Sequence, residues 1–182
     1  EVMPRAVLVM DEAYNELTDD PAANSLVDRV RAGDNLIVAR TFSKVYGMAG
    51  LRVGYALGRP DLIARMRPWS MNFGGNTAGI AAAIASYADE AYIRSSRERI
   101  FEARAILQEA ARKAGLKTLP TAGNFLFVKV PDADRLQAAM EKQGIMIRGA
   151  YGPSWAQWSR VSCGRIEDVK RYAAALPRLV SA

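Results

Sequence analysis

Residues 35–58 read NLIVARTFSKVYGMAGLRVGYALG, and this stretch places one lysine between two expected strands. Residues 36–39 form a short apolar run with the β-branched enrichment of a buried strand, and residues 51–57 read as a second strand. Lys44 therefore falls on a glycine-rich connection, close to apolar surface and to a second cation, Arg52. Such surroundings disfavour the ammonium form and make an amine nucleophilic toward an aldehyde. The alternative is a solvated loop lysine, because lysine is usually exposed.

A second set of polar residues follows an apolar run near the N-terminus. Residues 6–10 read AVLVM, which has the length of a buried strand, and Asp11 and Tyr14 come directly after it. Ligands of open α/β sheets sit beyond the carboxyl ends of the strands. A carboxylate there can bind a heterocyclic nitrogen, and a phenol one turn away can donate a hydrogen bond. Taken alone, Asp11 is also a normal helix N-cap.

The order of these motifs resembles that of the pyridoxal-phosphate-dependent aminotransferases of the aspartate aminotransferase fold (class I/II). Within that group the chain looks most like the histidinol-phosphate aminotransferase branch. The resemblance rests on DEAY (11–14), RTFSKVYGMAGLRVGY (40–55), GNFLFV (123–128), GIMIRG (144–149) and SRVSCG (159–164). It extends over nearly the whole chain, and the block around Lys44 is its most specific part.

The resemblance implies roles for six residues around the cofactor, pyridoxal 5'-phosphate. Lys44 matches the lysine that forms the Schiff base with the cofactor and later moves a proton. Asp11 matches the carboxylate that keeps the pyridine nitrogen protonated, and Tyr14 matches the phenol beside the ring oxygen. The positions that bind the cofactor phosphate are Thr41, Ser43 and Arg52.

Three further residues match substrate-binding positions. Arg160 matches the arginine that binds the substrate α-carboxylate, and Asn124 is expected near the same group. Arg148 falls where the histidinol-phosphate enzymes keep an arginine for the substrate phosphate. For both arginines, the alternative is surface salt-bridging. Tyr151, Trp155 and Trp158 depart from the phosphate-substrate enzymes, and aromatic walls favour an aromatic or apolar substrate side chain.

The sequence therefore predicts an α/β fold in two parts. Residues 1–88 are expected to be the C-terminal part of a large cofactor-binding domain with a mostly parallel sheet. Residues 89–182 are expected to form a small α/β domain. Helices are expected over 21–31, 60–67, 76–87, 89–113, 134–142 and 167–179, and further strands over 116–119, 124–130, 145–148 and 158–162.

Composition excludes several other kinds of chemistry. The 182 residues contain no histidine and one cysteine, Cys163, so a Ser-His-Asp triad, an intrachain disulfide and a cysteine-based metal cluster are excluded. The net charge of +6 raises the alternative of a basic nucleic-acid-binding module. However, the basic residues alternate with acids, as in residues 94–104, and no recognised nucleic-acid motif accompanies them. We expect no nucleic-acid partner and, without a long apolar run, no membrane span.

The expected activity is transfer of an amino group between an L-amino acid, or an amine like histidinol phosphate, and a 2-oxo acid. A β-eliminating lyase of the same fold is the alternative, because it shares Lys44, Asp11 and Arg160. The resemblance begins in the middle of the cofactor domain, so we expect an N-terminal half of the same protein to be missing here and the isolated piece to be inactive. The fold implies a homodimer. A cytoplasmic location is the default expectation.

Overall fold

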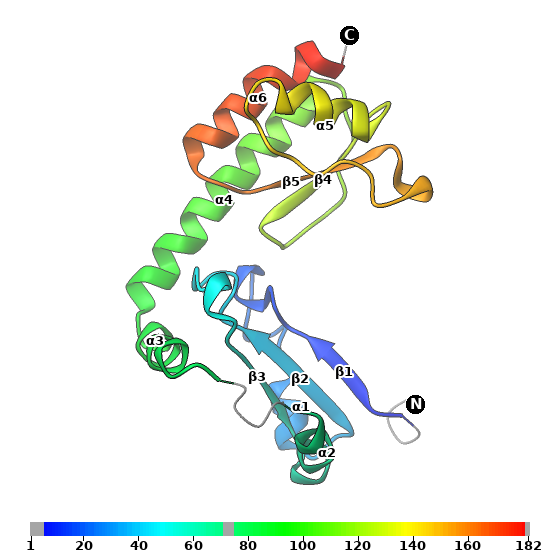
Figure 1. The fold of residues 1–182 in the computed structure, drawn as a ribbon. Coiled ribbons are helices and arrows are strands. Elements are labelled where there is room, and N and C mark those ends of the chain that lie inside the picture. Colours follow the sequence, from blue (N-terminus) through cyan, green and yellow to red (C-terminus); the bar gives the residue numbers. More distant parts are fainter. Residues whose placement is uncertain (1–5, 71–74, 181–182) are drawn as a thin grey trace. The chain divides into compact units, whose positions relative to one another are not determined.

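The computed structural model describes residues 6–70 and 75–180, and its contacts divide the chain into two compact units, residues 1–96 and 97–182 (Figure 1). The sequence placed the boundary near residue 88, between two helices. The elements of the first unit are β1 (Leu8–Asp11), α1 (Val27–Arg31), β2 (Leu36–Thr41), β3 (Gly54–Gly58), α2 (Pro60–Met66) and α3 (Thr77–Tyr87). Helix α4 (Glu90–Lys113) begins in this unit and continues into the second.

The described sheet of the first unit has the order β1-β2-β3 (Figure 1). Strand β2 pairs parallel with β1 and antiparallel with β3. Leu36, Ile37 and Val38 of β2 are buried, and α1 contacts both β2 and β3. The central strand is thus an apolar run, as the sequence predicted.

The second unit packs helices on a two-stranded antiparallel sheet. Its elements are β4 (Phe125–Lys129), α5 (Ala133–Glu141), β5 (Trp158–Ser162) and α6 (Ile166–Val180), together with the C-terminal part of α4. Buried side chains from all of these elements form one core, with Leu107, Leu126, Met140 and Leu176 fully enclosed. The predicted α/β class is confirmed in both units.

Helix boundaries follow capping chemistry where the sequence supplies it. The side chain of Asn76 accepts the amide of Gly79 at the start of α3, and Asp132 accepts two amides at the start of α5. Helix α4 is followed by Gly115 at φ +69°, which is a left-handed position that glycine tolerates.

Several predicted elements were placed wrongly. Strand β1 was expected to be buried, but Val9 is 63% exposed, and among the described residues β1 pairs with β2 alone. The strand predicted for 51–57 begins at Gly54, since Arg52 has a left-handed backbone. The helix predicted for 21–31 begins at Val27. The strands predicted for 116–119 and 145–148 are reduced to single bridges, Thr118 with Val128 and Arg148 with Arg160.

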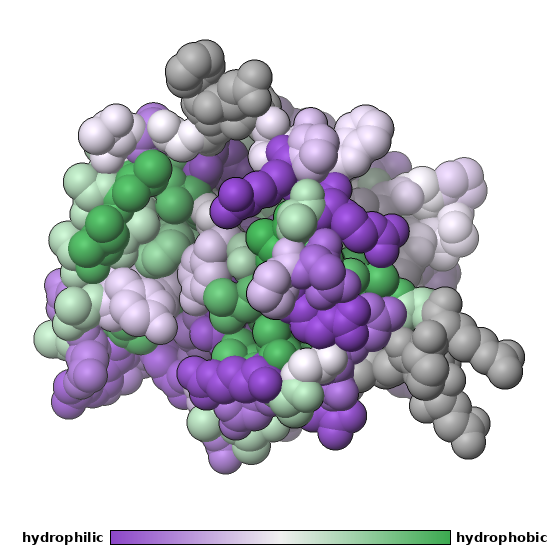
Figure 2. All heavy atoms as spheres, turned by 90° about the horizontal axis from the view of Figure 1, so that it is seen from below, coloured by the Kyte–Doolittle hydropathy of each residue, from purple (hydrophilic) through white to green (hydrophobic). Residues whose placement is uncertain are grey.

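None of the described helices combines the length and the apolar character that a membrane crossing requires. Hydrophobic side chains nevertheless reach the surface, as the green areas of Figure 2 show. In the first unit they include Val9, Trp69 and Ile84.

Candidate active site

Lys44 lies on a tight turn that follows β2. The amide of Gly47 donates to the Lys44 carbonyl at 2.9 Å, and the amide of Met48 donates to the Phe42 carbonyl at 3.0 Å. Gly47 has φ +70°, a conformation that residues with a Cβ rarely adopt. Phe42 is buried and its ring lies 4.8 Å from the ring of Tyr46. The backbone around Lys44 is therefore fixed by hydrogen bonds and by apolar anchors.

Tyr14 lies directly beside the amine of Lys44. The Lys44 Nζ is 5.1 Å from the centroid of the Tyr14 ring, which is within the range of a cation–π contact. Both side chains are half-buried. Residues thirty positions apart in the sequence thus meet, and they are two of the residues that the motifs singled out.

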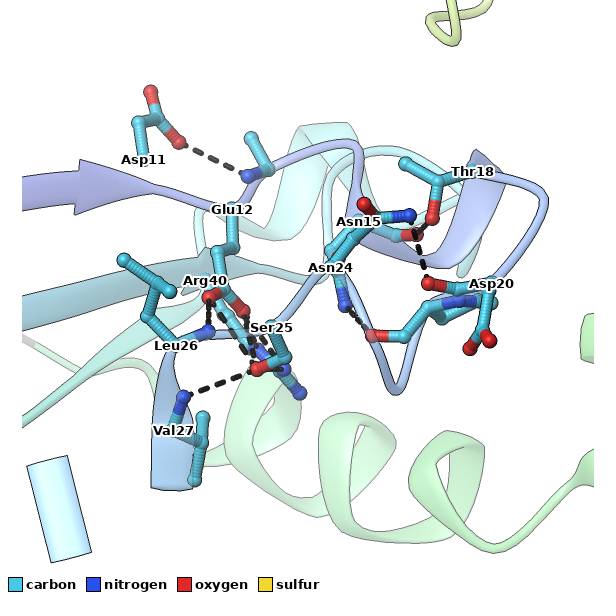
Figure 3. A network of polar contacts seen from close by, with 12 residues as sticks. Asp11, Glu12, Asn15, Thr18, Asp20, Asn24, Ser25, Leu26, Val27 and Arg40 are labelled. Atoms are coloured by element: carbon cyan, nitrogen blue, oxygen red, sulfur yellow. Dashed lines mark hydrogen bonds and ion pairs between the residues drawn. The ribbon is translucent and has the colours of Figure 1, made fainter. Parts of the chain in front are cut away.

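Asp11 is brought to the same edge of the sheet by strand register. It lies opposite Ala39 in the parallel pair β1–β2, so both strands end close to each other. The Asp11 Oδ1 accepts the amide of Ala13 at 3.0 Å, and the side chain is exposed (Figure 3). The sequence analysis placed Asp11 directly after the strand, but Asp11 is the last residue of β1 itself.

Hydroxyl groups and a guanidinium gather next to Lys44. The Thr41 Oγ1 accepts the amide of Ser43 at 3.0 Å, and Arg52 Nη1 lies 3.4 Å from the Ser43 Oγ. Arg52 Nη1 also donates to the Ala49 carbonyl at 2.9 Å. The backbone of Arg52 is left-handed, with φ 54°, and it is the one non-glycine residue with positive φ in the described ranges. Strain of this kind clusters at functional sites.

A buried ion pair next to this site was missed by the sequence analysis. Glu12 Oε2 accepts from Arg40 Nη2 at 2.8 Å, and the same carboxylate accepts the Leu26 amide at 2.7 Å and the Ser25 hydroxyl at 3.0 Å (Figure 3). Burial alone would lower the pKa of the Arg40 guanidinium. The hydrogen bonds with Glu12 and Tyr55 outweigh this effect and raise the pKa above its usual value. The available signal was an arginine inside an otherwise apolar strand, because such a charge needs a partner.

In the second unit, the two predicted arginines lie opposite each other. The amide of Arg148 donates to the Arg160 carbonyl and the amide of Arg160 donates to the Arg148 carbonyl, both at 3.0 Å. Neither guanidinium forms an ion pair with any residue in the described ranges, so the salt-bridge alternative finds no support there. Asn124 accepts the Cys163 amide through its carbonyl at 2.8 Å, and within residues 6–70 and 75–180 its side chain bonds to neither arginine.

A hollow of about 300 Å³ opens beside these arginines. Its walls are Met146, Ile147, Arg148, Tyr151, Arg160 and Ser162. Of the three aromatic residues singled out from the sequence, Tyr151 lines this hollow. Trp155 instead lies 5.3 Å from Phe127 and 6.3 Å from Trp158, ring centroid to ring centroid. That the aromatic residues select the substrate side chain stays a prediction.

A larger hollow in the first unit, of about 710 Å³, contains none of the predicted site residues. It is lined mainly by apolar side chains, among them Ile37, Leu62, Met66 and Trp69. The polar groups that the sequence selected lie at the carboxyl ends of β1 and β2 instead. The candidate site is therefore identified by the chemistry of its side chains and does not coincide with this hollow.

These features define a mixed α/β protein whose first unit presents an amine, a phenol, a carboxylate, two hydroxyls and a guanidinium around one turn. The chain belongs to the aminotransferase class I and II family, whose sequence pattern matches residues 2–176.

Individual relatives agree with this assignment. The chain is 38% identical over 182 residues to histidinol-phosphate aminotransferase 1 of Cupriavidus pinatubonensis, with 98% of this chain and 48% of that protein covered. It is 39% identical over 180 residues to histidinol-phosphate aminotransferase 2 of Ralstonia nicotianae, covering 97% and 48%. The histidinol-phosphate aminotransferase of Sinorhizobium meliloti, solved in complex with pyridoxal-5'-phosphate, superposes with a TM-score of 0.86 at 33% identity, covering 97% and 49%. The chain spans about half the length of these relatives.

Proposed function

We propose that this chain is the part of a pyridoxal-phosphate-dependent aminotransferase that carries the reactive lysine and the substrate carboxylate site. One observation carries the proposal: the Lys44 amine lies 5.1 Å from the Tyr14 ring centroid, on the turn that also bears Ser43. The family and the names of the relatives support it.

The residues present fit pyridoxal phosphate. Two hydroxyls, of Thr41 and Ser43, and the guanidinium of Arg52 are the donors that a phosphate dianion needs. The carboxylate of Asp11 can accept a hydrogen bond from a protonated ring nitrogen, and the phenol of Tyr14 can donate to a ring oxygen. When bound, the cofactor supplies an aldehyde carbon and a ring that accepts an electron pair.

The roles of the chain's own residues follow from their chemistry. The Lys44 Nζ would hold the cofactor through its aldehyde group, and as an amine beside the substrate carbon it could accept and donate a proton. The Tyr14 ring limits the positions open to Nζ. The left-handed backbone of Arg52 directs its guanidinium back toward Ser43, where it binds phosphate. The carboxylate of Asp11 would face the ring nitrogen of the cofactor and accept its hydrogen bond.

Substrate binding is assigned to the second unit. A guanidinium binds a carboxylate through two parallel N–H donors, and Arg160 has no acidic partner among the described residues. We therefore propose Arg160 for the α-carboxylate of an amino acid or 2-oxo acid. We assign Arg148 to a second anionic group, and Asn124 to the vicinity of the same carboxylate.

Partners are proposed on the same basis. The relatives are about twice as long as this chain, and β1 exposes Val9 at an edge of the described sheet. We propose that the preceding half of the same protein covers this edge and completes the cofactor site. We also propose that the complete protein is a homodimer, by analogy with the fold.

The test uses the complete protein with Lys44→Ala, and Lys117→Ala as a matched control at an exposed lysine. Amino transfer should fall about 10³-fold in Lys44→Ala and stay unchanged in Lys117→Ala. Borohydride treatment should attach the cofactor to Lys44 in the unmodified protein, as peptide mass mapping would show. Attachment elsewhere, or undiminished activity of Lys44→Ala, contradicts the proposal. Release of ammonia and 2-oxo acid without amino transfer would indicate a lyase.

A further inference from the structure

The two arginines of the second unit are placed where their charges repel. Arg148 and Arg160 face each other across an antiparallel bridge with both backbone hydrogen bonds formed. Side chains of such a pair lie on the same face of the ladder, about 5 Å apart at Cβ, and like charges there are destabilising. Because neither guanidinium has an acidic partner in the part of the chain that the structure describes, something else must hold them.

Tyr151 contacts both arginines, each in a different way. Arg160 Nη1 donates to the Tyr151 hydroxyl at 2.9 Å. The Cζ of Arg148 lies 5.0 Å from the centroid of the Tyr151 ring. One side chain therefore offers its oxygen to one guanidinium and its ring face to the other.

These contacts leave hydrogen-bond donors unused. A guanidinium carries five N–H donors, and the bond to Tyr151 uses one of those of Arg160. A cation–π contact uses the face of the guanidinium and not its N–H edge. The Phe125 ring also lies under Arg160, with its centroid 4.6 Å from Cζ. Both arginines can thus present N–H groups to an anion in the hollow that Tyr151 lines with them.

The turn that carries Tyr151 is itself anchored. The Gly149 amide donates to Gln137 Oε1 at 2.8 Å, and the Ala150 amide donates to Asp134 Oδ1 at 2.9 Å, so α5 holds the turn. A Cβ on Gly149 would come too close to Asp134 Oδ1 and Gln137 Oε1, so these two side chains would have to move and give up their present hydrogen bonds. The Tyr151 ring lies 5.8 Å from the Phe127 ring, in an edge contact.

We propose that Tyr151 is a positioning residue that sets the guanidiniums of Arg160 and Arg148 for the anionic groups of the substrate. The assignment of those groups rests on the proposed aminotransferase function. Tyr151 itself acts through the arginines: its hydroxyl orients Arg160, and its ring keeps Arg148 from turning away from its neighbour.

Two variants separate the hydroxyl from the ring, and the complete protein is used for both. Tyr151→Phe removes the acceptor for Arg160 and keeps the ring, so the KM of the carboxylate substrate should rise about fivefold while kcat changes less than about twofold. Tyr151→Leu removes the ring as well, so the KM should rise by about a further threefold. This further rise should vanish in an Arg148→Gln background, because the ring then has no cation to hold. Tyr87→Phe, at an exposed tyrosine, is the matched control.

A direct binding measurement distinguishes this proposal from the proposed function. Titration calorimetry with succinate, an unreactive dicarboxylate, should show weaker binding to Tyr151→Phe than to the unmodified protein. If succinate binds equally to both and amino transfer is present, the role of Tyr151 is refuted and the function stands. If amino transfer is absent but Tyr151→Phe weakens succinate binding, the function fails and Tyr151 keeps its role. A fall in kcat at unchanged KM would also refute positioning.

Discussion

Arg52 combines a strained backbone with a functional side chain. A left-handed conformation costs a non-glycine residue about 1–2 kcal/mol, and Arg52 adopts it at φ 54°. Its guanidinium meanwhile bonds to the Ala49 carbonyl and approaches Ser43. The sequence placed Arg52 at the site through its spacing from Lys44. It did not show the strain, because backbone angles depend on the turn as a whole.

Replacing Arg52 separates these two effects. Arg52→Gly and Arg52→Ala both remove the guanidinium, so the dissociation constant for pyridoxal phosphate should rise about tenfold in each. The glycine variant should exceed the alanine variant in unfolding free energy by about 1 kcal/mol, since glycine tolerates positive φ. Urea unfolding and cofactor titration measure the two quantities. An alanine variant as stable as the glycine variant would show that position 52 carries no strain.

The buried hydroxyl of Tyr172 lowers the stability of the second unit. Its ring is buried, and its hydroxyl has no hydrogen-bond partner in the described ranges. Burial raises the pKa of this phenol. Tyr172→Phe should therefore increase the free energy of unfolding by about 1 kcal/mol, measured by urea denaturation. Tyr87→Phe, where the hydroxyl is exposed, should leave it unchanged. A loss of stability in Tyr172→Phe would show that the hydroxyl is satisfied in solution.

Cys163 gives a pH-dependent signal, and it is the one cysteine of the chain. Burial raises the pKa of its thiol from 9.0 to about 11, against the opposing charge of Arg104. A raised pKa means that the folded state disfavours the thiolate. The contribution of this thiol to stability is thus complete below about pH 9 and is lost as the pH rises from about 9 to about 11.

Alkylation measures this effect directly. The thiolate is the form that reacts with iodoacetamide. At pH 8 the labelling rate of Cys163 should therefore be lower in the folded protein than in the protein unfolded in urea, by a factor of roughly ten or more. In Cys163→Ala, the fall in unfolding free energy between pH 9 and pH 11 should be smaller. Equal labelling rates in buffer and in urea would show that the thiol is accessible.

At the scale of elements, the polar network of Glu12 joins three segments that the sequence leaves separate. Its carboxylate links the end of β1, the start of α1 at Leu26, and Arg40 of β2 (Figure 3). This explains why α1 begins at Val27 and not near residue 21: the Glu12 carboxylate binds the Leu26 amide from outside the helix. Such a cause is non-local and could not be predicted from capping residues, although Asp20 does cap the local turn at Ala23.

Glu12→Ala tests how much this network contributes. The side chains of Glu12 and Arg40 are 4% and 17% exposed, so removing the carboxylate leaves a largely buried cation without a partner. We expect a loss of about 3 kcal/mol in unfolding free energy. Asp28→Ala removes an exposed ion pair with Arg31 and should cost less than about 1 kcal/mol. Urea denaturation measures both losses. Similar losses in the two variants would show that the buried ion pair contributes no more to the unfolding free energy than the exposed one.

The sheets show where sequence patterns suffice. Strands β2 and β5 matched their predicted ranges closely, because each is an apolar or alternating run. The segments near Thr118 and Arg148 form only single bridges, although their composition is that of strands. Pairing depends on which neighbour is available, and that is decided by the fold of the unit and not by local propensity.

At the scale of the whole molecule, the motifs predicted which residues share a unit. Asp11, Tyr14, Thr41, Ser43, Lys44 and Arg52 lie in the first unit, and Asn124, Arg148 and Arg160 lie in the second. Their roles stay predictions. The Tyr14–Lys44 and Arg148–Arg160 pairs follow the order of the motifs, whereas the bond from Arg160 to Tyr151 depends on side-chain geometry that no spacing shows.

The exposed edge of the first unit predicts how the 182-residue chain behaves alone. Strand β1 is one edge of the described sheet, and its exposed residues Leu8 and Val9 are apolar, the one charge on the strand being Asp11 at its end. Exposed edges of this kind pair with other chains, and an edge lysine prevents it. We therefore expect the isolated chain to self-associate with increasing concentration, as sedimentation velocity would show, and Val9→Lys to keep it monomeric. Ile84→Lys places the same charge on the exposed face of helix α3 and controls for general loss of apolar surface. If Ile84→Lys suppresses self-association to the same extent as Val9→Lys, then exposed apolar surface in general drives the association, and not the strand edge. A chain that stays monomeric at every concentration would show that the edge of β1 is already protected.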